Sequence, residues 1–189
     1  IQLILGFVNR LVFIRCLNAE YLGVNGLFTN ILSMLSLAEL GIGTAIVYEL
    51  YRPLAEKDEN KIASLMKFYQ KAYCGIGLFI AIIGAALIPF LNILIAEPPK
   101  ISENLVLIYC IFLFNTASSY FFAYKCSILI ADQKNYIVVG INYIVMFIQS
   151  IVQILILIVT SNFILYLICQ SVGIFAYNLI IAKTADKKY

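Results

Sequence analysis

The chain has 189 residues, of which 63% are hydrophobic and only 12% are charged. The charged share is about half of that in a typical soluble domain, and the mean hydropathy is +0.97. A soluble fold of this size cannot bury so much apolar surface, which excludes a water-soluble globular domain. The chain has no histidine, which excludes Ser-His-Asp and Cys-His catalysis and any His-ligated metal site.

The sequence offers no chemistry for catalysis or for a cofactor. Its five cysteines form no C-x-x-C pair, so we expect neither a disulfide framework nor a zinc site. No phosphate-binding loop, nucleotide fingerprint or cluster of metal ligands occurs. We therefore predict a protein that is not an enzyme, with no cofactor, no metal and no nucleic-acid partner.

The apolar runs predict an all-α, polytopic transmembrane bundle of about six spans, since each span needs about 20 apolar residues. The first run begins at residue 1 and reads as a span whose beginning is missing. A short polar link at 18–23 follows it, and Gly41 and Gly43 should allow a bend in the second span or a close helix contact. The predicted spans are 1–17, 25–50, 72–96, 104–131, 136–159 and 163–182.

The segment 51–71 is the one strongly charged stretch between these runs. Pro53 should end the helix that precedes it, and Asp58 should cap a new helix. Apolar residues then recur at helical spacing, which predicts an amphipathic helix lying at the cytoplasmic membrane surface. The alternative is a solvated loop helix. The recurring residues are Ile62, Leu65, Met66 and Tyr69.

Basic residues divide unevenly between the two sides that six alternating spans would create. Arg15 and Lys100 fall on one side, whereas ten basic residues fall on the other. Because positively charged loops remain in the cytoplasm, the side with ten is predicted to be cytoplasmic. The ten are Arg52, Lys57, Lys61, Lys67, Lys71, Lys125, Lys134, Lys183, Lys187 and Lys188.

Three charged residues fall inside predicted spans, where a charge costs roughly 2.5–3.5 kcal/mol unless it has a partner or water. Arg10 and Lys125 could contact an anionic substrate, with Glu39 as a partner or gating contact. The alternatives are an internal ion pair and, for Lys125 near a span end, snorkelling of the ammonium toward water.

Uncharged polar residues form stripes on the last three spans. Asn142, Gln149 and Gln153 share one helix face, because offsets of 7 and 11 residues return to nearly the same direction. Such faces either make interhelical hydrogen bonds or line a hydrated cavity, and three of them in one bundle favour a cavity. The other two groups are Tyr166, Gln170, Gly173 and Tyr177 in the sixth span, and Asn115, Thr116, Ser118 and Ser119 in the fourth.

Several short stretches also carry a family resemblance when taken together in chain order. They are 21–28 (YLGVNGLF), 35–43 (LSLAELGIG), 50–55 (LYRPLA), 61–62 (KI) with 65–66 (LM), 89–91 (PFL) and 131–136 (ADQKNY). As a set they resemble bacterial polysaccharide-biosynthesis flippases, the O-antigen and capsule-repeat flippases of the multidrug/oligosaccharidyl-lipid/polysaccharide superfamily. The likeness covers most of residues 10–140.

The resemblance implies a function and a set of partners. Such flippases move undecaprenyl-diphosphate-linked oligosaccharide repeats to the outer leaflet of the bacterial cell membrane by alternating access, using two bundles of about six spans. Residues 1–189 would be a MATE-like N-terminal lobe, so the absent C-terminal lobe is an expected partner. Membrane lipids, a polysaccharide polymerase and glycosyltransferases are further expected partners. The candidate substrate-binding residues are Arg10, Arg15, Glu39, Lys125, Asn142, Gln149 and Gln153, the arginines attracting the diphosphate or acidic sugars.

Two other classes of function remain open. A cation-coupled multidrug (MATE-type) exporter often has a carboxylate in its first bundle, but the first span here has only Asn9 and Arg10. A cationic wall suits an anionic lipid better than a cationic drug. A non-transporting membrane scaffold for cell-wall synthesis has little reason to keep buried charges such as Arg10 and Glu39.

Overall fold

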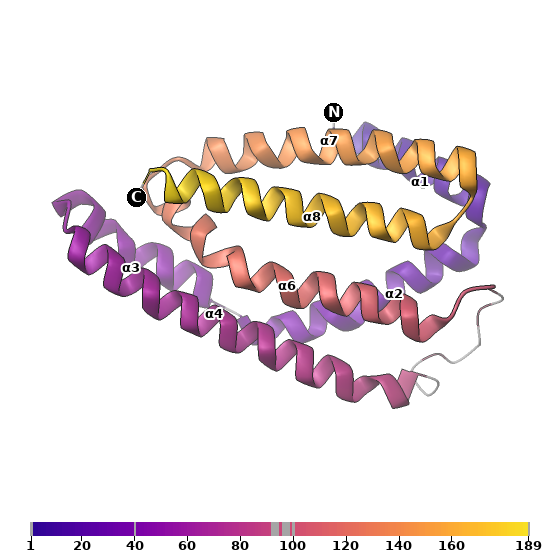
Figure 1. Cartoon of the computed structure of the whole chain (residues 1–189), viewed down its shortest axis with the longest axis horizontal. Coiled ribbons are helices and arrows are strands. Elements are labelled where there is room, and N and C mark those ends of the chain that lie inside the picture. Colours follow the sequence, from indigo (N-terminus) through magenta and orange to yellow (C-terminus); the bar gives the residue numbers. More distant parts are fainter. Residues whose placement is uncertain (1, 40, 92–94, 96–98, 100, 189) are drawn as a thin grey trace.

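Figure 1 shows the chain as a bundle of long helices. This computed structural model describes residues 2–39, 41–91, 95, 99 and 101–188, and the side chains of all of these but 2–4 and 38. The described residues contain helices and turns and no strand. The helices are α1 (Gln2–Leu17), α2 (Ala19–Ser36), α3 (Ile42–Glu56), α4 (Glu59–Leu87), α6 (Leu105–Ala131), α7 (Asn135–Thr160) and α8 (Phe163–Asp186), with 3-10 turns η1 (Leu37–Glu39) and η2 (Ile88–Phe90).

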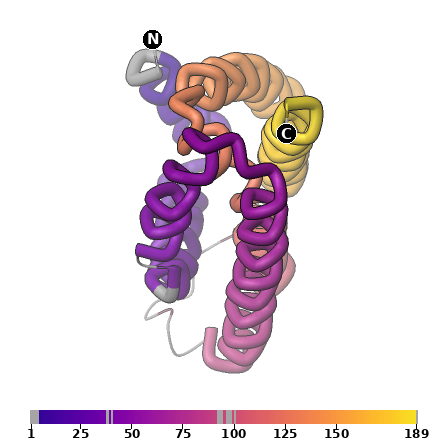
Figure 2. Tube along the Cα trace, turned by 90° about the vertical axis from the view of Figure 1, so that its left-hand side faces the viewer, coloured from indigo at the N-terminus to yellow at the C-terminus, as the bar shows by residue number. Residues whose placement is uncertain are grey.

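The central helix of the bundle is α6. It packs against α3 and α4 on one side and against α8 on the other, while α7 packs against α8 and α1. Seen from the α3–α4 turn, α7 and α8 lie together above and α3 and α4 lie below (Figure 2). The α3–α4 turn, the α6–α7 turn and the end of α8 meet at one end of the bundle, and the α1–α2 corner and the α7–α8 turn lie at the other (Figure 1).

The surface of the bundle is more apolar than parts of its interior. Within the described residues, four helices are long and apolar enough to cross a membrane: α4 continued through η2, α6, α7 and α8. Large apolar side chains such as Leu78, Ile144 and Val172 are exposed on them, whereas Asn115 and Gln153 are buried. Exposed apolar surface on this scale belongs against lipid. The chain is therefore an all-α, multi-pass membrane protein, and the number of about six spans stays a prediction.

The last three predicted spans agree closely with α6, α7 and α8, and the predicted hairpin at 160–162 is confirmed. Polar residues set the starts of α6 and α8, because side-chain oxygens cap the free N–H groups of a first turn. Asn104 accepts from the N–H of Val106 at 2.9 Å. Asn162 accepts from the N–H of Leu165 at 3.1 Å. The described helix α8 continues to Asp186, beyond the predicted end at 182.

The predicted second span, 25–50, is not one helix in the structure. The chain is already helical from Ala19, so most of the predicted link 18–23 belongs to α2. The helix then breaks into η1 and a turn before α3 begins at Ile42. Gly41 has φ +83°, a left-handed conformation that favours glycine. The predicted bend is thus a complete interruption, and Glu39 lies in it.

The charged segment 51–71 also differs from its prediction. Pro53 does not end a helix, because α3 continues to Glu56 before a left-handed Lys57 stops it. Asp58 does cap the next helix, accepting from the N–H of Lys61 at 3.0 Å. That helix, α4, runs without a break to Leu87. The amphipathic residues are therefore the first part of a long helix instead of a separate interfacial helix.

Two glycines on one face of α4 allow α6 to approach closely. Interhelical contacts in a membrane depend on close packing, since lipid supplies no hydrophobic drive between helices. A methyl group at Gly77 would lie 3.1 Å from the carbonyl oxygen of Ala117. At Gly84 a methyl group would overlap the side chain of Leu113, and the Tyr109 hydroxyl donates to the Gly84 carbonyl oxygen at 2.9 Å. Small residues thus fix the α4–α6 interface.

The α1–α2 corner is held by side chains from several helices. The Tyr21 hydroxyl donates to Glu103, just before α6, at 2.5 Å. Phe163 of α8 packs edge-on against the rings of Phe13 and Tyr21, with centroids 5.8 and 5.1 Å away. The predicted turn at Lys100 and the end of the predicted span 72–96 lie outside the described residues.

Candidate functional site: a polar groove

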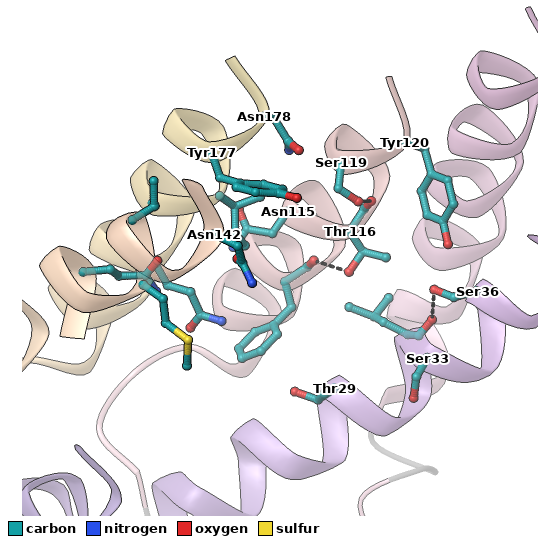
Figure 3. Close-up of a pocket in the computed structure, with 18 residues that line it drawn as sticks. Thr29, Ser33, Ser36, Asn115, Thr116, Ser119, Tyr120, Asn142, Tyr177 and Asn178 are labelled. Carbon is teal, nitrogen blue, oxygen red and sulfur yellow. Dashed lines mark hydrogen bonds between the residues drawn. The ribbon is translucent and has the colours of Figure 1, made fainter. Parts of the chain in front are cut away.

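Polar side chains from α2, α6, α7 and α8 converge on one central cavity of about 520 Å³. Asn142 and Gln149 of α7 line it together with Gln170 of α8. Figure 3 shows the labelled side chains of Thr29, Asn115 and Asn142 directed toward the same space from three different helices. The remaining polar lining residues are Ser33, Ser36, Thr116, Ser119, Tyr120, Tyr177 and Asn178.

A smaller cavity of about 290 Å³ adjoins the central one on the side of α1. The two share Gln149 and Gln170 as lining residues. Arg10 and Asn9 of α1 line this cavity with Gln153 of α7. Arg10 is exposed and forms no ion pair among the described residues, so its guanidinium remains available to an anion in this cavity.

A third cavity, of about 700 Å³, adjoins the central one on the side of the helix break. These two share Ser119, Tyr120, Tyr177 and Asn178. Glu39 lines the third cavity and accepts a hydrogen bond from the Tyr73 hydroxyl at 2.9 Å. We call the three adjoining cavities the polar groove. It runs from Arg10 at one end to Glu39 at the other.

Close backbone approaches position several of these side chains. Gln149 lies against Gly173 of α8, where a methyl group would overlap its carboxamide oxygen. At the other end of the groove, a methyl group at Gly43 would lie 3.1 Å from the Tyr73 hydroxyl oxygen. The two glycines thus leave room for Gln149 and for the Tyr73–Glu39 pair.

Only part of the polar surface is used in contacts between helices. Gln153 accepts from Asn9 at 3.2 Å and donates to the Tyr166 carbonyl oxygen at 3.5 Å. Thr116 and Ser119 instead donate to carbonyl oxygens of their own helix. The Oδ1 atoms of Asn9 and Asn115 are buried and accept no hydrogen bond from the protein. A buried acceptor without a donor costs about 1–3 kcal/mol of folding free energy. A ligand that donates hydrogen bonds to these two oxygen atoms would remove that cost.

The structure brings together five of the seven candidate site residues and separates two. Arg10, Gln149 and Gln153 share one cavity, Asn142 and Gln149 share the next, and Glu39 lines the third. Lys125 lines none of them, because it lies near the other face of α6 and binds Asp186 at 2.6 Å. Arg15 is exposed in the last turn of α1 and lines none of the three cavities. Arg10 and Glu39 lie at opposite ends, which leaves no ion pair between them.

The polar face of α2 was not among the sequence predictions. Asn25, Thr29, Ser33 and Ser36 recur at i, i+4, i+8 and i+11, which is the spacing of one helix face. Thr29, Ser33 and Ser36 line the central cavity, and Asn25 lines the cavity of Arg10. The same test that found the stripe on α7 would have found this one. Tyr73 was also missed, because nothing in the sequence relates it to Glu39 34 residues earlier.

The described residues contain no group of three or more His, Cys, Asp or Glu side chains able to hold a metal ion. Comparison of the chain with protein-family models, curated proteins and solved structures finds no match. The chemistry of the polar groove is therefore the basis for a functional proposal.

Proposed function

We propose that this chain is one helix bundle of a flippase that moves undecaprenyl-diphosphate-linked oligosaccharides across the bacterial cytoplasmic membrane for surface-polysaccharide synthesis. The observation that carries the proposal is the polar groove, which combines a cation at one end with buried acceptors that lack donors. A lipid-linked sugar supplies both complements, an anionic diphosphate and many hydroxyl donors.

The sugar end of such a substrate fits the middle of the groove. Hydroxyl groups donate and accept hydrogen bonds, as do the amides of Asn142, Gln149 and Gln170. The Asn115 Oδ1 atom is buried without a donor. A hydrogen bond from a sugar hydroxyl would remove the free-energy cost of that burial. Arg10 would bind the diphosphate, since a guanidinium makes bidentate, charge-assisted bonds to phosphate oxygens.

The path of the chain suits a membrane bundle with six passes. α2 and α3 together run from one end of the bundle to the other (Figure 1), and we count them as one broken pass. The break at η1 places irregular backbone beside a polar cavity, which is the setting that membranes tolerate. On this count, the end with the α3–α4 turn carries the ten basic residues and faces the cytoplasm.

The groove is open to the surface, since its lining residues Thr29, Ser33 and Asn142 are exposed. A second wall is therefore needed to enclose a polar headgroup. We assign that wall to a second helix bundle, in the same protein or in a partner chain. Alternating access would then follow from the two bundles closing on either side of the groove. Glycosyltransferases and a polysaccharide polymerase would supply and consume the substrate.

One observation favours a second candidate, the cation-coupled multidrug exporter. Glu39 is a carboxylate that lines the groove, and a carboxylate suits a cationic drug or a coupling ion. The Arg10 guanidinium at the opposite end of the groove would repel a cationic drug. The anionic lipid-linked substrate therefore fits the groove as a whole better.

The test is an equilibrium binding measurement on the full chain in lipid nanodiscs with three probes. They are a fluorescent undecaprenyl-diphosphate disaccharide, the corresponding undecaprenol without diphosphate or sugar, and the lipophilic cation tetraphenylphosphonium. We expect saturable binding of the first, at least about tenfold tighter than that of undecaprenol. Preferential binding of tetraphenylphosphonium would support the exporter instead. Equal binding of all three would contradict a specific substrate site.

A further inference from the structure

A separate cavity of about 770 Å³ lies at the end of the bundle where basic residues gather. The start of α4, the end of α6 and the end of α8 form its walls. None of its lining residues lines the polar groove. We call it the basic cavity. Its charged lining residues are Lys67, Lys125, Lys187 and Lys188 with Glu59 and Asp186.

The basic cavity is amphipathic. Its apolar lining residues are withdrawn from water, with Ile128 and Tyr124 buried and Ile62 half-buried. The ammonium groups of Lys187 and Lys188 belong to exposed residues at the end of α8. A ligand that fills the cavity would therefore meet apolar walls inside and cations at its opening.

Lys125 is fixed in this cavity by Asp186. Its ammonium donates to both carboxylate oxygens, at 2.7 and 2.6 Å, and its side chain is only 20% exposed. The contact joins residues 61 positions apart and ties the end of α8 to α6. Because an ammonium has three N–H donors, this pairing leaves Lys125 a donor for an anion in the cavity.

Positive charge predominates around the basic cavity, since four lysines face two carboxylates. The effect extends to the neighbouring α6–α7 turn. There the pKa of Lys134 is lowered, first by burial and then by the charge of Lys188, although Lys134 also pairs with Asp132. An anion placed in the cavity would relieve the repulsion among these lysines.

We propose that the basic cavity binds the phosphate headgroup of an anionic phospholipid. The cations at the opening match the phosphate, and the apolar walls around Ile62 and Ile128 match the glycerol and first acyl carbons, which a free phosphate ion lacks. Basic pockets between membrane helices at the cytoplasmic surface are suited to such headgroups. This site depends on the membrane location of the chain and is independent of any substrate in the polar groove.

The test measures the thermal unfolding of the full chain in neutral detergent during titration with dioctanoyl phosphatidylglycerol. Parallel titrations use dioctanoyl phosphatidylcholine and inorganic phosphate. The cavity variant is Lys67→Gln/Lys187→Gln/Lys188→Gln. A matched variant, Lys57→Gln/Lys71→Gln/Lys183→Gln, removes the same charge from the same end of the bundle but from residues outside the cavity lining. A third variant, Lys67→Arg/Lys187→Arg/Lys188→Arg, keeps the charge.

We expect phosphatidylglycerol to raise the melting temperature saturably in the unmodified chain, the matched variant and the arginine variant. The cavity variant should bind it at least about tenfold more weakly. Equal loss of binding in the cavity and matched variants would overturn the proposal, because it would show a nonspecific charge effect. An equal response to phosphatidylcholine or to inorganic phosphate would also overturn it. A substrate that fails to bind the polar groove would leave these outcomes unchanged.

Discussion

Gln149 of α7 lies so close to Gly173 of α8 that a methyl group at position 173 would overlap its side-chain amide. Gln149 also lines two of the three cavities of the polar groove. The absence of a side chain at one position of α8 thus determines where a polar group of α7 points. A substitution at position 173 should therefore displace the side chain of Gln149 without changing Gln149 itself.

Gly173→Ala should displace the Gln149 carboxamide and weaken substrate binding roughly three- to tenfold, the loss of about one hydrogen bond. The fold should be retained, because the displaced group is a flexible side chain, and alanine is favoured over glycine in a helix by about 1 kcal/mol. Binding of the lipid-linked disaccharide and thermal unfolding measure the two effects. Gly140→Ala in α7 is the control, since nothing lies within 4 Å of its added methyl group. Unchanged binding in Gly173→Ala would remove Gln149 from the site.

The α4–α6 interface predicts different effects for two glycines on the same helix. Gly77→Ala should lower the free energy of unfolding by about 1–3 kcal/mol, because the new methyl group meets the backbone of α6. Gly75→Ala should be neutral or stabilising, since nothing lies within 4 Å of its added methyl group. Unfolding in mixed micelles with increasing denaturing detergent measures both. A similar destabilisation by the two substitutions would contradict the packing described for α4 and α6.

The Tyr73–Glu39 hydrogen bond should stabilise the break between α2 and α3. Tyr73→Phe should cost about 1–2 kcal/mol of unfolding free energy, since it takes a donor from a carboxylate in the groove. Tyr69→Phe, one turn earlier on α4 and also buried, should cost less because its hydroxyl makes no hydrogen bond to that carboxylate. The same unfolding assay compares them. A larger loss in Tyr69→Phe would show that Tyr73 acts by packing instead.

The orientation of the bundle can be tested with topology reporters. Fusions or inserted tags at Lys57 and Lys188 should report the cytoplasm, because both positions lie at the end with ten basic residues. A tag at Ser161, in the α7–α8 turn at the other end, should be accessible from outside. The reverse pattern, or two ends that report the same side, would contradict the proposed orientation.

Helices bounded by polar residues could be predicted from the sequence, and helices interrupted within apolar runs could not. α6 and α7 begin and end within about one residue of their predicted bounds, because charge-free runs meet capping residues such as Asn104. Hydropathy does not detect the break at Gly41, since apolar residues continue on both sides of it, with Leu40 before and Ile42 after. It also placed a boundary near residue 71, where α4 changes from amphipathic to apolar without a break in its hydrogen bonds.

The sequence predicted polar faces on individual helices, but it did not predict that these faces meet in one groove. Helical spacing identified the face of α7 that carries Asn142 and Gln149. Which faces meet depends on packing between distant residues, as in the contact of Gln149 with Gly173. Lys125 shows the same limit, because its partner Asp186 lies 61 residues away. The position of Lys125 in an apolar run thus suggested an ion pair as one alternative, but neither its partner nor the cavity that it lines.

The most direct test of the central claim compares Arg10→Ala with Arg15→Ala. Both arginines are exposed on α1, but only Arg10 lines the polar groove. Binding of the undecaprenyl-diphosphate disaccharide to the full chain in nanodiscs should weaken about tenfold in Arg10→Ala, the effect of a solvated charge-assisted hydrogen bond of about 1.5 kcal/mol. Arg15→Ala should bind within about twofold of the unmodified chain. Equal binding by both variants and the unmodified chain would contradict the role of the groove in binding an anionic lipid-linked sugar.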